Sequence, residues 1–312
     1  MTADLWQRRA AHARGVLGER FATGCGRLDG VDPRLAAALN DILARPGSMV
    51  RSVSSYLMGL EMNLADETAQ VVACGIEYLH TASLVFDDLP AMDDARVRRG
   101  AACAHIVHGE ALAMLAALAL VNRGYALLWQ GINRTHDAKR REWAGHWVDA
   151  RLGTGGMIGG QARDLRGWRG EQSPQEVSDV AARKTGELLR LTLVLPAILG
   201  GGTPREIQLL DRLALLRGLA YQAADDLKDV QMQEQSHGKT GGRDEELGRP
   251  NMVAAEGIHA TTRRFRRLQL MGNRVVDALP APPARWGMLE LLRVSLPEGL
   301  AGPALARVSA AG

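Results

Sequence analysis

Two groups of aspartates are the residues best suited to chemistry in this sequence. The first group lies in the segment DDLPAMDDARVRRG and contains Asp87, Asp88, Asp93 and Asp94. Carboxylates crowded in this way repel one another unless a cation neutralises them. Because no cysteine or histidine accompanies them, the oxygen ligands favour a hard ion such as Mg²⁺, which usually takes one or two carboxylates together with phosphate oxygens. The segment therefore predicts a magnesium site for a phosphorylated ligand.

The second group lies in the segment AYQAADDLKDV, which has helical spacing, and contains Asp225, Asp226 and Asp229. On a helix, Asp225 and Asp229 are about 40° apart around the axis, so they share a face. Gln222 lies on the same face, one turn earlier. A single Asp-Asp pair is usually a solvated turn or a helix cap, but two groups in one chain indicate a common role. We expect them to clamp a diphosphate through metal ions.

Two arginines and one histidine lie near the first aspartate group in the sequence. Arg98 and Arg99 follow them directly, and a guanidinium group binds phosphate oxygens in pairs. His80 precedes Asp87 by seven residues, nearly two helical turns, so both side chains are expected to point into one cavity. A lone histidine is more often structural, but this placement favours a role in binding.

Helices are the elements that must position these residues. Alanine, leucine and arginine recur and aromatic residues make up 4% of the chain, which favours helices over sheets. No stretch shows sustained alternation of apolar and polar residues. We expect an all-α, single-domain helical bundle over residues 1–312, with a loosely packed tail from about residue 296. The predicted helices cover residues 1–23, 32–45, 66–88, 109–131, 138–153, 156–167, 174–185, 186–199, 204–230, 251–276 and 287–295. Residues 278–287 are predicted to be a turn-rich connector, and the glycine-containing loop 231–250 is long enough to be a lid.

Composition and charge exclude several other classes of protein. The net charge is +3, and the densest basic run, at residues 263–267, is best explained as a solvated helix face rather than a nucleic-acid site. The three cysteines are far apart and odd in number, so no disulfide framework is expected. The longest uncharged apolar run, residues 111–121, is about half the length needed to span a bilayer. We expect a cytoplasmic protein with no transmembrane segment and no nucleic-acid partner.

The chain resembles the trans-type polyprenyl diphosphate synthases over residues 40–255. Besides the two aspartate segments, four motifs occur in the order found in that family: EYLHTASL at 77–84, GGQARDL at 159–165, KTGELL at 184–189 and GKTGGRDEELGRPN at 238–251. The resemblance implies the isoprenoid synthase fold, with a cavity between two aspartate-rich helices, and a homodimer. It also implies a prenyltransferase that condenses isopentenyl diphosphate with dimethylallyl, geranyl or farnesyl diphosphate, using three Mg²⁺ ions.

The resemblance further implies a role for each residue that matches a family motif. The magnesium ligands are Asp87, Asp88, Asp93, Asp225, Asp226 and Asp229, with Asp94 beside them. The residues that hold the allylic diphosphate are Arg98, Lys184, Lys239 and Arg249, and those that hold isopentenyl diphosphate are Arg51, His80 and Arg99. Thr185 and Gln222, together with Lys184, lie near the reacting groups. Gln161 and Asp164 either contact substrate or form a buried polar network that orients helices.

The segment ARPGSMVRSV departs from the family pattern. Ser48 stands where the family has lysine, and Ser52 stands where it has proline, although Arg51 is retained. The loss of one cation should weaken the binding of isopentenyl diphosphate, unless Arg45 or another nearby cation compensates. Alternatively, the protein uses a single prenyl diphosphate, as a class I terpene cyclase does. A non-catalytic partner subunit of another synthase is a third possibility, which the intact aspartates disfavour.

Product length depends on the residues four and five positions before Asp87. These are Ser83 and Ala82, whereas farnesyl-forming relatives often carry an aromatic residue there. Small side chains leave room for a longer product, which we expect Met114 or Leu118 to limit from the helix at 109–131. The resemblance is to bacterial, carotenoid-type geranylgeranyl diphosphate synthases and implies a C20 product.

Overall fold

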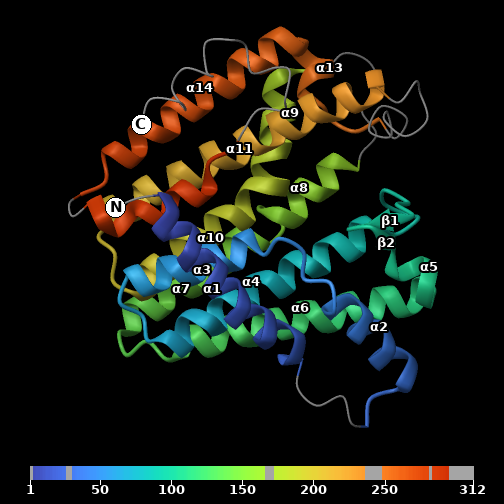
Figure 1. Ribbon diagram of the computed structural model, residues 1–312, viewed down its shortest axis with the longest axis horizontal. Coiled ribbons are helices and arrows are strands. Elements are labelled where there is room, and N and C mark those ends of the chain that lie inside the picture. Colours follow the sequence, from blue (N-terminus) through green and yellow to red (C-terminus); the bar gives the residue numbers. More distant parts are fainter. Residues whose placement is uncertain (1–2, 26–29, 166–171, 236–247, 281–282, 295–312) are drawn as a thin grey trace. The chain divides into compact units, whose positions relative to one another are not determined.

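The computed structural model describes residues 3–25, 30–165, 172–235, 248–280 and 283–294 (Figure 1). The chain forms two compact units, each built from segments that are distant in sequence. Unit 1 comprises Met1–Asp149, Leu191–Gln208 and Pro280–Leu291, and unit 2 comprises Ala150–Arg190, Leu209–Leu279 and Leu292–Gly312. The prediction of an all-α fold is confirmed, because the only strands in the described residues are two of two residues each.

Unit 1 contains the first aspartate group and the helices that position it. Its elements are α1 (Ala3–Thr23), α2 (Pro33–Leu43), α3 (Val50–Glu61), α4 (Asp66–Asp87), β1 (Val97–Arg98), β2 (Ala101–Ala102), α5 (Ala104–His108), α6 (Glu110–Asn133) and most of α7 (Ala138–Leu152). Helices α4 and α6 lie side by side (Figure 1). They approach closely at two glycines, since a Cβ atom on Gly75 would lie 3.0 Å from the carbonyl oxygen of Gly124. This contact fixes the helix that ends at Asp87.

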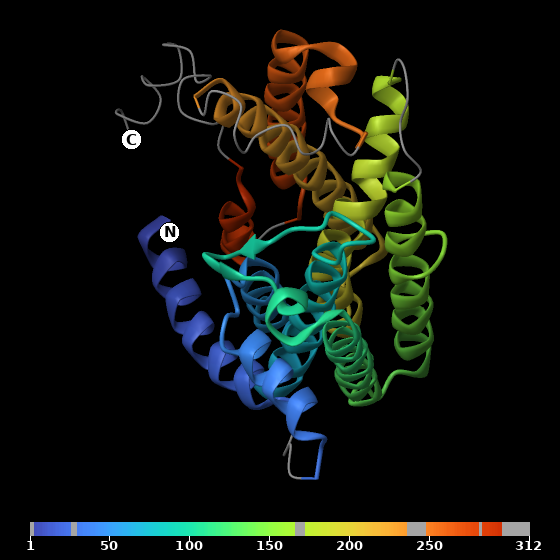
Figure 2. The ribbon, with the colours of Figure 1, turned by 90° about the vertical axis from the view of Figure 1, so that its right-hand side faces the viewer.

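Unit 2 contains the second aspartate group. Its elements are α8 (Met157–Asp164), α9 (Pro174–Ala181), the π-helical turn η1 (Ala182–Gly186), α13 (Met252–Glu256) and α14 (Ile258–Asp277), with the adjoining parts of α10 (Glu187–Leu199) and α11 (Pro204–Gln235). Figure 2 shows α13 and α14, in orange, as a packed pair. Phe265 of α14 packs against alanines of α11 at positions 220, 223 and 224, so α14 covers the helix that carries the second aspartates.

Most predicted helices are confirmed, with differences at particular residues. The predicted helix at 251–276 is two helices, because Gly257 has a φ of 82° and interrupts the hydrogen-bond ladder between α13 and α14. Helix α3, the β1–β2 hairpin and α5 were not predicted. The predicted connector at 278–287 is wrong in part, because the 3₁₀ helix η2 (Pro283–Leu292) begins within it and buries Trp286 in the core.

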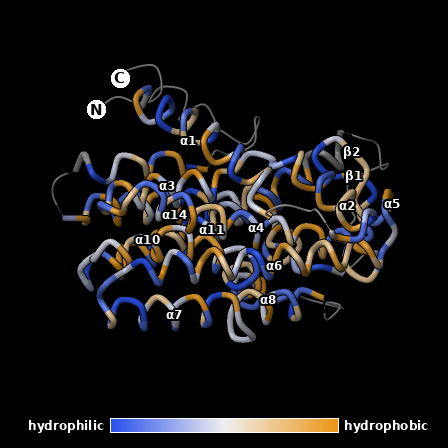
Figure 3. Tube along the Cα trace, turned by 90° about the horizontal axis from the view of Figure 1, so that it is seen from below, coloured by the Kyte–Doolittle hydropathy of each residue, from blue (hydrophilic) through white to orange (hydrophobic). Residues whose placement is uncertain are grey.

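Two described helices, α4 and α6, are long and apolar enough to cross a membrane by length and composition alone. The apolar stretch of α4 is 72% buried within the chain, which is typical of a core helix, whereas that of α6 is only 39% buried. Figure 3 shows apolar residues recurring along α6. Both helices were predicted, at residues 66–88 and 109–131, but the uncharged apolar run at 111–121 covers only part of α6.

Candidate functional site

The loop after α4 folds back onto the end of the helix. The Asp93 amide donates to the Asp87 carbonyl oxygen at 2.9 Å, and the Asp94 amide donates to that of Leu89 at 3.0 Å. Asp94 adopts a left-handed conformation with a φ of 44°, which a non-glycine residue rarely does outside constrained sites. The loop thus brings the Asp93 backbone next to Asp87.

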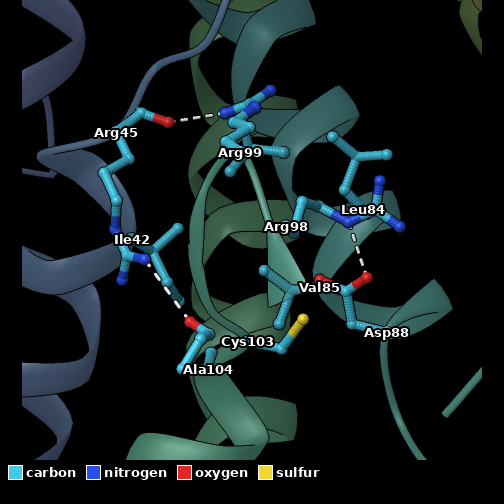
Figure 4. A pocket seen from close by; sticks show the side chains of 11 residues that line it. Ile42, Arg45, Leu84, Val85, Asp88, Arg98, Arg99, Cys103 and Ala104 are labelled. Carbon is cyan, nitrogen blue, oxygen red and sulfur yellow. Dashed lines mark hydrogen bonds and ion pairs between the residues drawn. The ribbon is translucent and has the colours of Figure 1, made fainter. Parts of the chain in front are cut away.

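Asp88 is buried and forms an ion pair with Arg98. Its side chain accepts a 2.6 Å hydrogen bond from Nε of Arg98 (Figure 4), and the residue is 4% exposed. Burial raises the pKa of the Asp88 carboxyl, although the Arg98 charge acts in the opposite direction. Two residues predicted to bind metal and phosphate therefore bind each other, and any metal at Asp88 must share the carboxylate with Arg98.

Arg99 is held against the loop between α2 and α3. Its Nη1 donates to the carbonyl oxygen of Arg45 at 2.6 Å (Figure 4). A Cβ atom on Gly47 would lie 2.4 Å from Cζ of Arg99, and Gly47 has a φ of 71°, so only glycine fits this position. Arg99 itself has a φ of 53°. The hydrogen bond that holds the Arg99 guanidinium group is therefore to a backbone carbonyl oxygen and not to a carboxylate.

Arg51 and His80 meet beside this arginine. Nη1 of Arg51 lies 3.2 Å from Nε2 of His80, which joins the first turn of α3 to α4. Burial, reinforced by the charges of Arg51 and Arg99, lowers the pKa of His80 well below its usual range, so the ring is neutral near pH 7. The structure brings together the residues predicted for isopentenyl diphosphate, all from unit 1.

The environment of Ser48 shows which cation is close to the altered position. Ser48 is exposed, while Arg45 lines a cavity of about 50 Å³ together with Arg98 and Arg99. Nη2 of Arg45 pairs with Asp41, and its Nη1 lies 3.4 Å from the carbonyl oxygen of Ala102. Arg45 is thus available as a compensating cation only if the diphosphate competes with its present partner.

In unit 2, the aspartates of α11 differ in exposure. Asp225 is exposed and Asp229 half-buried, on the face that helical spacing predicts. Asp226 is 1% exposed and accepts hydrogen bonds from Nε2 of Gln222 at 2.8 Å and from the Met252 amide at 2.7 Å. Asp226 therefore ties α11 to the start of α13 in addition to any role with a metal.

Thr185 and Gln222, both predicted to lie near the reacting carbons, contact each other. The Thr185 hydroxyl donates to Oε1 of Gln222 at 3.2 Å. Thr185 and Lys184 lie in the π-helical turn η1, a conformation that is rare and frequent at functional sites. The sequence gives no sign of this turn.

Asp164 organises the cations of unit 2. Nζ of Lys184 lies 2.6 Å from Oδ2 of Asp164, and Nη1 of Arg249 donates to the Asp164 carbonyl oxygen at 3.3 Å. Asp164 and Arg249 are 6% and 7% exposed. These contacts favour the buried-network interpretation of Asp164. Gln161 is half-buried on the same helix, and Lys239 lies outside the described residues.

The donor set fits a magnesium ion held partly by substrate. Within the described ranges, no three histidine, cysteine, aspartate or glutamate side chains are grouped to hold a metal by themselves. Mg²⁺ commonly uses one or two carboxylates and completes its shell with water and phosphate oxygens. Asp87 and Asp93, whose backbones are hydrogen-bonded, and Asp225 and Asp229, on one face of α11, are the candidate carboxylates in each unit.

The residues predicted to set product length lie in different environments. Ala82 is fully buried, and the Ser83 hydroxyl donates to the His80 carbonyl oxygen at 2.8 Å. Met114 and Leu118 are 44% and 57% exposed. That Met114 or Leu118 limits product length stays a prediction.

Similarity to known proteins extends over most of the chain. The family model for polyprenyl synthetase matches residues 32–277. The chain is 34% identical to geranylgeranyl pyrophosphate synthase 9, chloroplastic, of Arabidopsis thaliana over 69% of its length and 62% of that protein. It is 32% identical to farnesyl diphosphate synthase of Bacillus subtilis over 60% of its length and 64% of the relative. The chain thus spans less than two thirds of these relatives.

A solved structure is also similar. The crystal structure of geranyltransferase from Helicobacter pylori complexed with magnesium and isoprenyl diphosphate has a TM-score of 0.75 and 26% identity, and the match covers 91% of this chain and 96% of that one. With the family model matching more than half of the sequence, the chain belongs to the polyprenyl synthetase family.

Proposed function

We propose that this protein is a magnesium-dependent prenyltransferase that condenses isopentenyl diphosphate with an allylic diphosphate to form geranylgeranyl diphosphate. The observation that carries the proposal is the cluster of Arg51, His80 and Arg99 in unit 1, where two guanidinium groups and a neutral imidazole converge from α3, α4 and the β1–β2 hairpin. Such a cluster suits a diphosphate that keeps its charge throughout the reaction. A protein that only ionises an allylic substrate has no need of it.

The chain's own residues supply binding and charge stabilisation. Bound magnesium would neutralise negative charge on the departing diphosphate, held by carboxylates of both aspartate groups; we propose three ions. Arg98 in unit 1 and Lys184 in unit 2 each offer a cation to diphosphate oxygens, since preformed cations stabilise developing negative charge. Asp88 and Asp164 keep these two cations oriented. The released diphosphate accepts the proton, so no protein base is required.

A class I terpene cyclase is the second candidate, and one observation favours it. Ser48 is exposed at the position where the family carries lysine, and Arg45 is paired with Asp41. An isopentenyl diphosphate site with one cation fewer binds its ligand more weakly. The intact contacts of Arg51 and Arg99 favour the synthase over this alternative.

One assay separates the two candidates. Purified protein is incubated with Mg²⁺, labelled isopentenyl diphosphate and each of the C5, C10 and C15 allylic diphosphates, and the products are separated by chain length. Label in a C20 diphosphate is the result expected. Hydrocarbon or alcohol released without isopentenyl diphosphate supports the cyclase, and a product other than C20 contradicts the proposed chain length. Omitting Mg²⁺ tests the metal requirement, and titration calorimetry with an allylic thiolodiphosphate counts the ions.

We also propose a homodimer, formed through an outward apolar face of α5 and α6. Its exposed side chains are Ile106, Val107, Met114, Leu115 and Leu118. Apolar patches of this kind mark protein contacts. In light scattering, Leu115→Glu combined with Leu118→Glu is expected to give a monomer. The matched control, Leu270→Glu on α14, where Leu270 is 60% exposed, should remain a dimer; monomeric wild-type protein would contradict the proposal.

The location of the protein is proposed to be cytoplasmic, with no nucleic-acid partner. The arginines at 263, 266 and 267 of α14 are exposed to solvent, and Arg264 is paired with Glu256. Several plant relatives are named chloroplastic, so a fluorescent fusion in the host cell is the direct test.

A further inference from the structure

Glu77 is a buried acid at the start of the EYLHTASL motif, and the family resemblance implies no role for it. It lies on α4, one turn before His80, and is 1% exposed. Its Oε2 atom is buried without a hydrogen-bond partner among the described residues. A buried carboxylate costs free energy unless charges and hydrogen bonds compensate for the lost water, so its surroundings should explain why it is there.

The first compensation comes from the start of α3. The residue before this helix, Met49, has a φ of 55° and forms no side-chain cap in the described chain. The ladder of α3 begins with the Val53 amide, which donates to the Met49 carbonyl oxygen at 2.9 Å. The amides before it have no acceptor within the helix. The Ser52 amide hydrogen-bonds Glu77, so a residue of α4 caps α3, while the Ser52 hydroxyl donates to the Met49 carbonyl oxygen at 3.1 Å.

The second compensation comes from two arginines. Arg51 and Arg99 both attract the Glu77 carboxylate and partly offset the effect of burial, which raises its pKa. Arg51 also contacts His80, and Arg99 is fixed by the Arg45 carbonyl oxygen. One carboxylate therefore lies among the cations of the site without being exposed to a ligand itself.

We propose that Glu77 is the positioning residue of the isopentenyl diphosphate site: its buried carboxylate fixes the first turn of α3 and orients the guanidinium groups of Arg51 and Arg99 toward the diphosphate. This inference rests on the proposed function. The proposal also gives a reason for serine at position 52, where the family pattern has proline. Serine has an amide hydrogen to donate to Glu77, and proline has none. Ser52 and Glu77 form a coupled pair in this chain.

A positioning role and a structural role predict opposite effects on stability. Because burial raises the pKa of Glu77, ionising it at neutral pH opposes folding. Glutamine has the same shape, can still accept from Ser52 and lacks the charge, so Glu77→Gln should not lower the melting temperature. It removes the attraction that orients Arg51 and Arg99.

The test is steady-state kinetics of Glu77→Gln, with Glu67→Gln as the matched control, since Glu67 is an exposed glutamate on the same helix. In Glu77→Gln, we expect the KM for isopentenyl diphosphate to rise about tenfold, with the KM for the allylic substrate and the melting temperature unchanged. The control should match wild type in all three. An unchanged or lower KM for isopentenyl diphosphate, or equal rises for both substrates, would overturn the proposal.

A second variant approaches the pair from the other side. Ser52→Pro restores the family residue but removes the amide that binds Glu77, and is expected to raise the same KM by a similar factor. The double variant should be no worse than Glu77→Gln alone, because coupled residues are non-additive. Full additivity contradicts a shared role.

Failure of the proposed function can be distinguished from failure of this inference. If wild-type protein forms no coupled product, calorimetric binding of isopentenyl diphosphate replaces KM as the readout. Weaker binding to Glu77→Gln than to wild type then supports the role of Glu77 although the proposed reaction has failed. Equal binding, or no binding to wild type, overturns it.

Discussion

Lys184 and Asp164 form an ion pair at 2.6 Å between the π-helical turn and the end of α8, and the Asp164 side chain is 8% exposed. The same carboxylate lies 4.0 Å from Nε of Arg249. One buried acid therefore orients both described cations that are proposed to hold the allylic diphosphate in unit 2. The Lys184 ammonium group ends a flexible side chain, so it needs a fixed partner such as the Asp164 carboxylate to stay in one position.

Asp164→Asn removes the carboxylate charge that Lys184 and Arg249 share. Both cations are then expected to lose their fixed positions and to remain partly buried without that counter-charge. Breaking a buried hydrogen-bonded pair typically costs about 1–3 kcal/mol in the free energy of unfolding, which urea titration measures, and the KM for the allylic diphosphate should rise. The control is Asp179→Asn, which breaks exposed ion pairs with Arg163 and Arg183. It should cost less than about 1 kcal/mol. Equal costs in the two variants would contradict a special role for Asp164.

The second aspartate group should separate into residues with different effects. Asp225 is exposed, so Asp225→Ala is expected to remove most Mg²⁺-dependent turnover, by about 100-fold or more, while the melting temperature stays unchanged. Asp226→Ala should lose activity and stability together, because the Gln222 side chain and the Met252 amide lose their acceptor. Near-normal turnover of a folded Asp225→Ala protein would remove Asp225 from the metal site.

The periodicity of apolar residues predicts the helices that bury a continuous apolar face. It does not predict helices whose buried face also contains polar residues. Helix α3 was missed because Ser52, Ser54 and Ser55 interrupt its apolar pattern, yet all three are fully buried. Gly257 breaks the predicted helix at 251–276, although an isolated glycine within a helical pattern is often tolerated. These features depend on contacts with other segments.

For the candidate site, the sequence predicted which residues share a helix face but not which of them bind one another. Helical spacing correctly places Asp225 and Asp229 on one face, and the proximity of His80 to Arg51 was expected from family motifs alone. The pairing of Asp88 with Arg98 across the loop follows from the hairpin, which has strands of two residues and no alternating pattern to reveal it. Glu77 was overlooked because a glutamate within an apolar helix gives no sign of its partners.

Ser48→Lys tests whether the altered cation site limits the second substrate. The added ammonium group would stand two residues before the α3 turn that carries Arg51, and a favourable charge-assisted contact is worth about 1–2 kcal/mol. The KM for isopentenyl diphosphate is expected to fall about fivefold to thirtyfold, with the allylic KM unchanged. Arg45→Ala in the wild-type background provides the comparison: a rise in the same KM identifies Arg45 as the compensating cation. No change in either variant would mean that neither position contacts the diphosphate.

Ala82→Tyr tests the floor of the product cavity. Ala82 is fully buried on α4, five residues before Asp87, so a phenol there must occupy space that the growing chain would use or displace its neighbours. A shorter product is expected, read by chromatography of the dephosphorylated alcohols. Leu270→Tyr, at an exposed position on α14, is the control and should leave product length unchanged. An unchanged product from folded Ala82→Tyr protein would place the floor elsewhere.

His80 should make stability depend on pH. Burial, together with Arg51 and Arg99, lowers the pKa of His80 well below its usual value, whereas in the unfolded chain it is about 6.5. Unfolding therefore takes up a proton below pH 6.5, and stability present above that pH is lost as pH falls, by up to about 1.4 kcal/mol per pH unit. In urea titrations between pH 7.5 and 5.5, His80→Gln should lose less stability than wild type. His136→Gln, at an exposed position, should follow wild type; the same slope for His80→Gln would show that folding does not lower the pKa of His80.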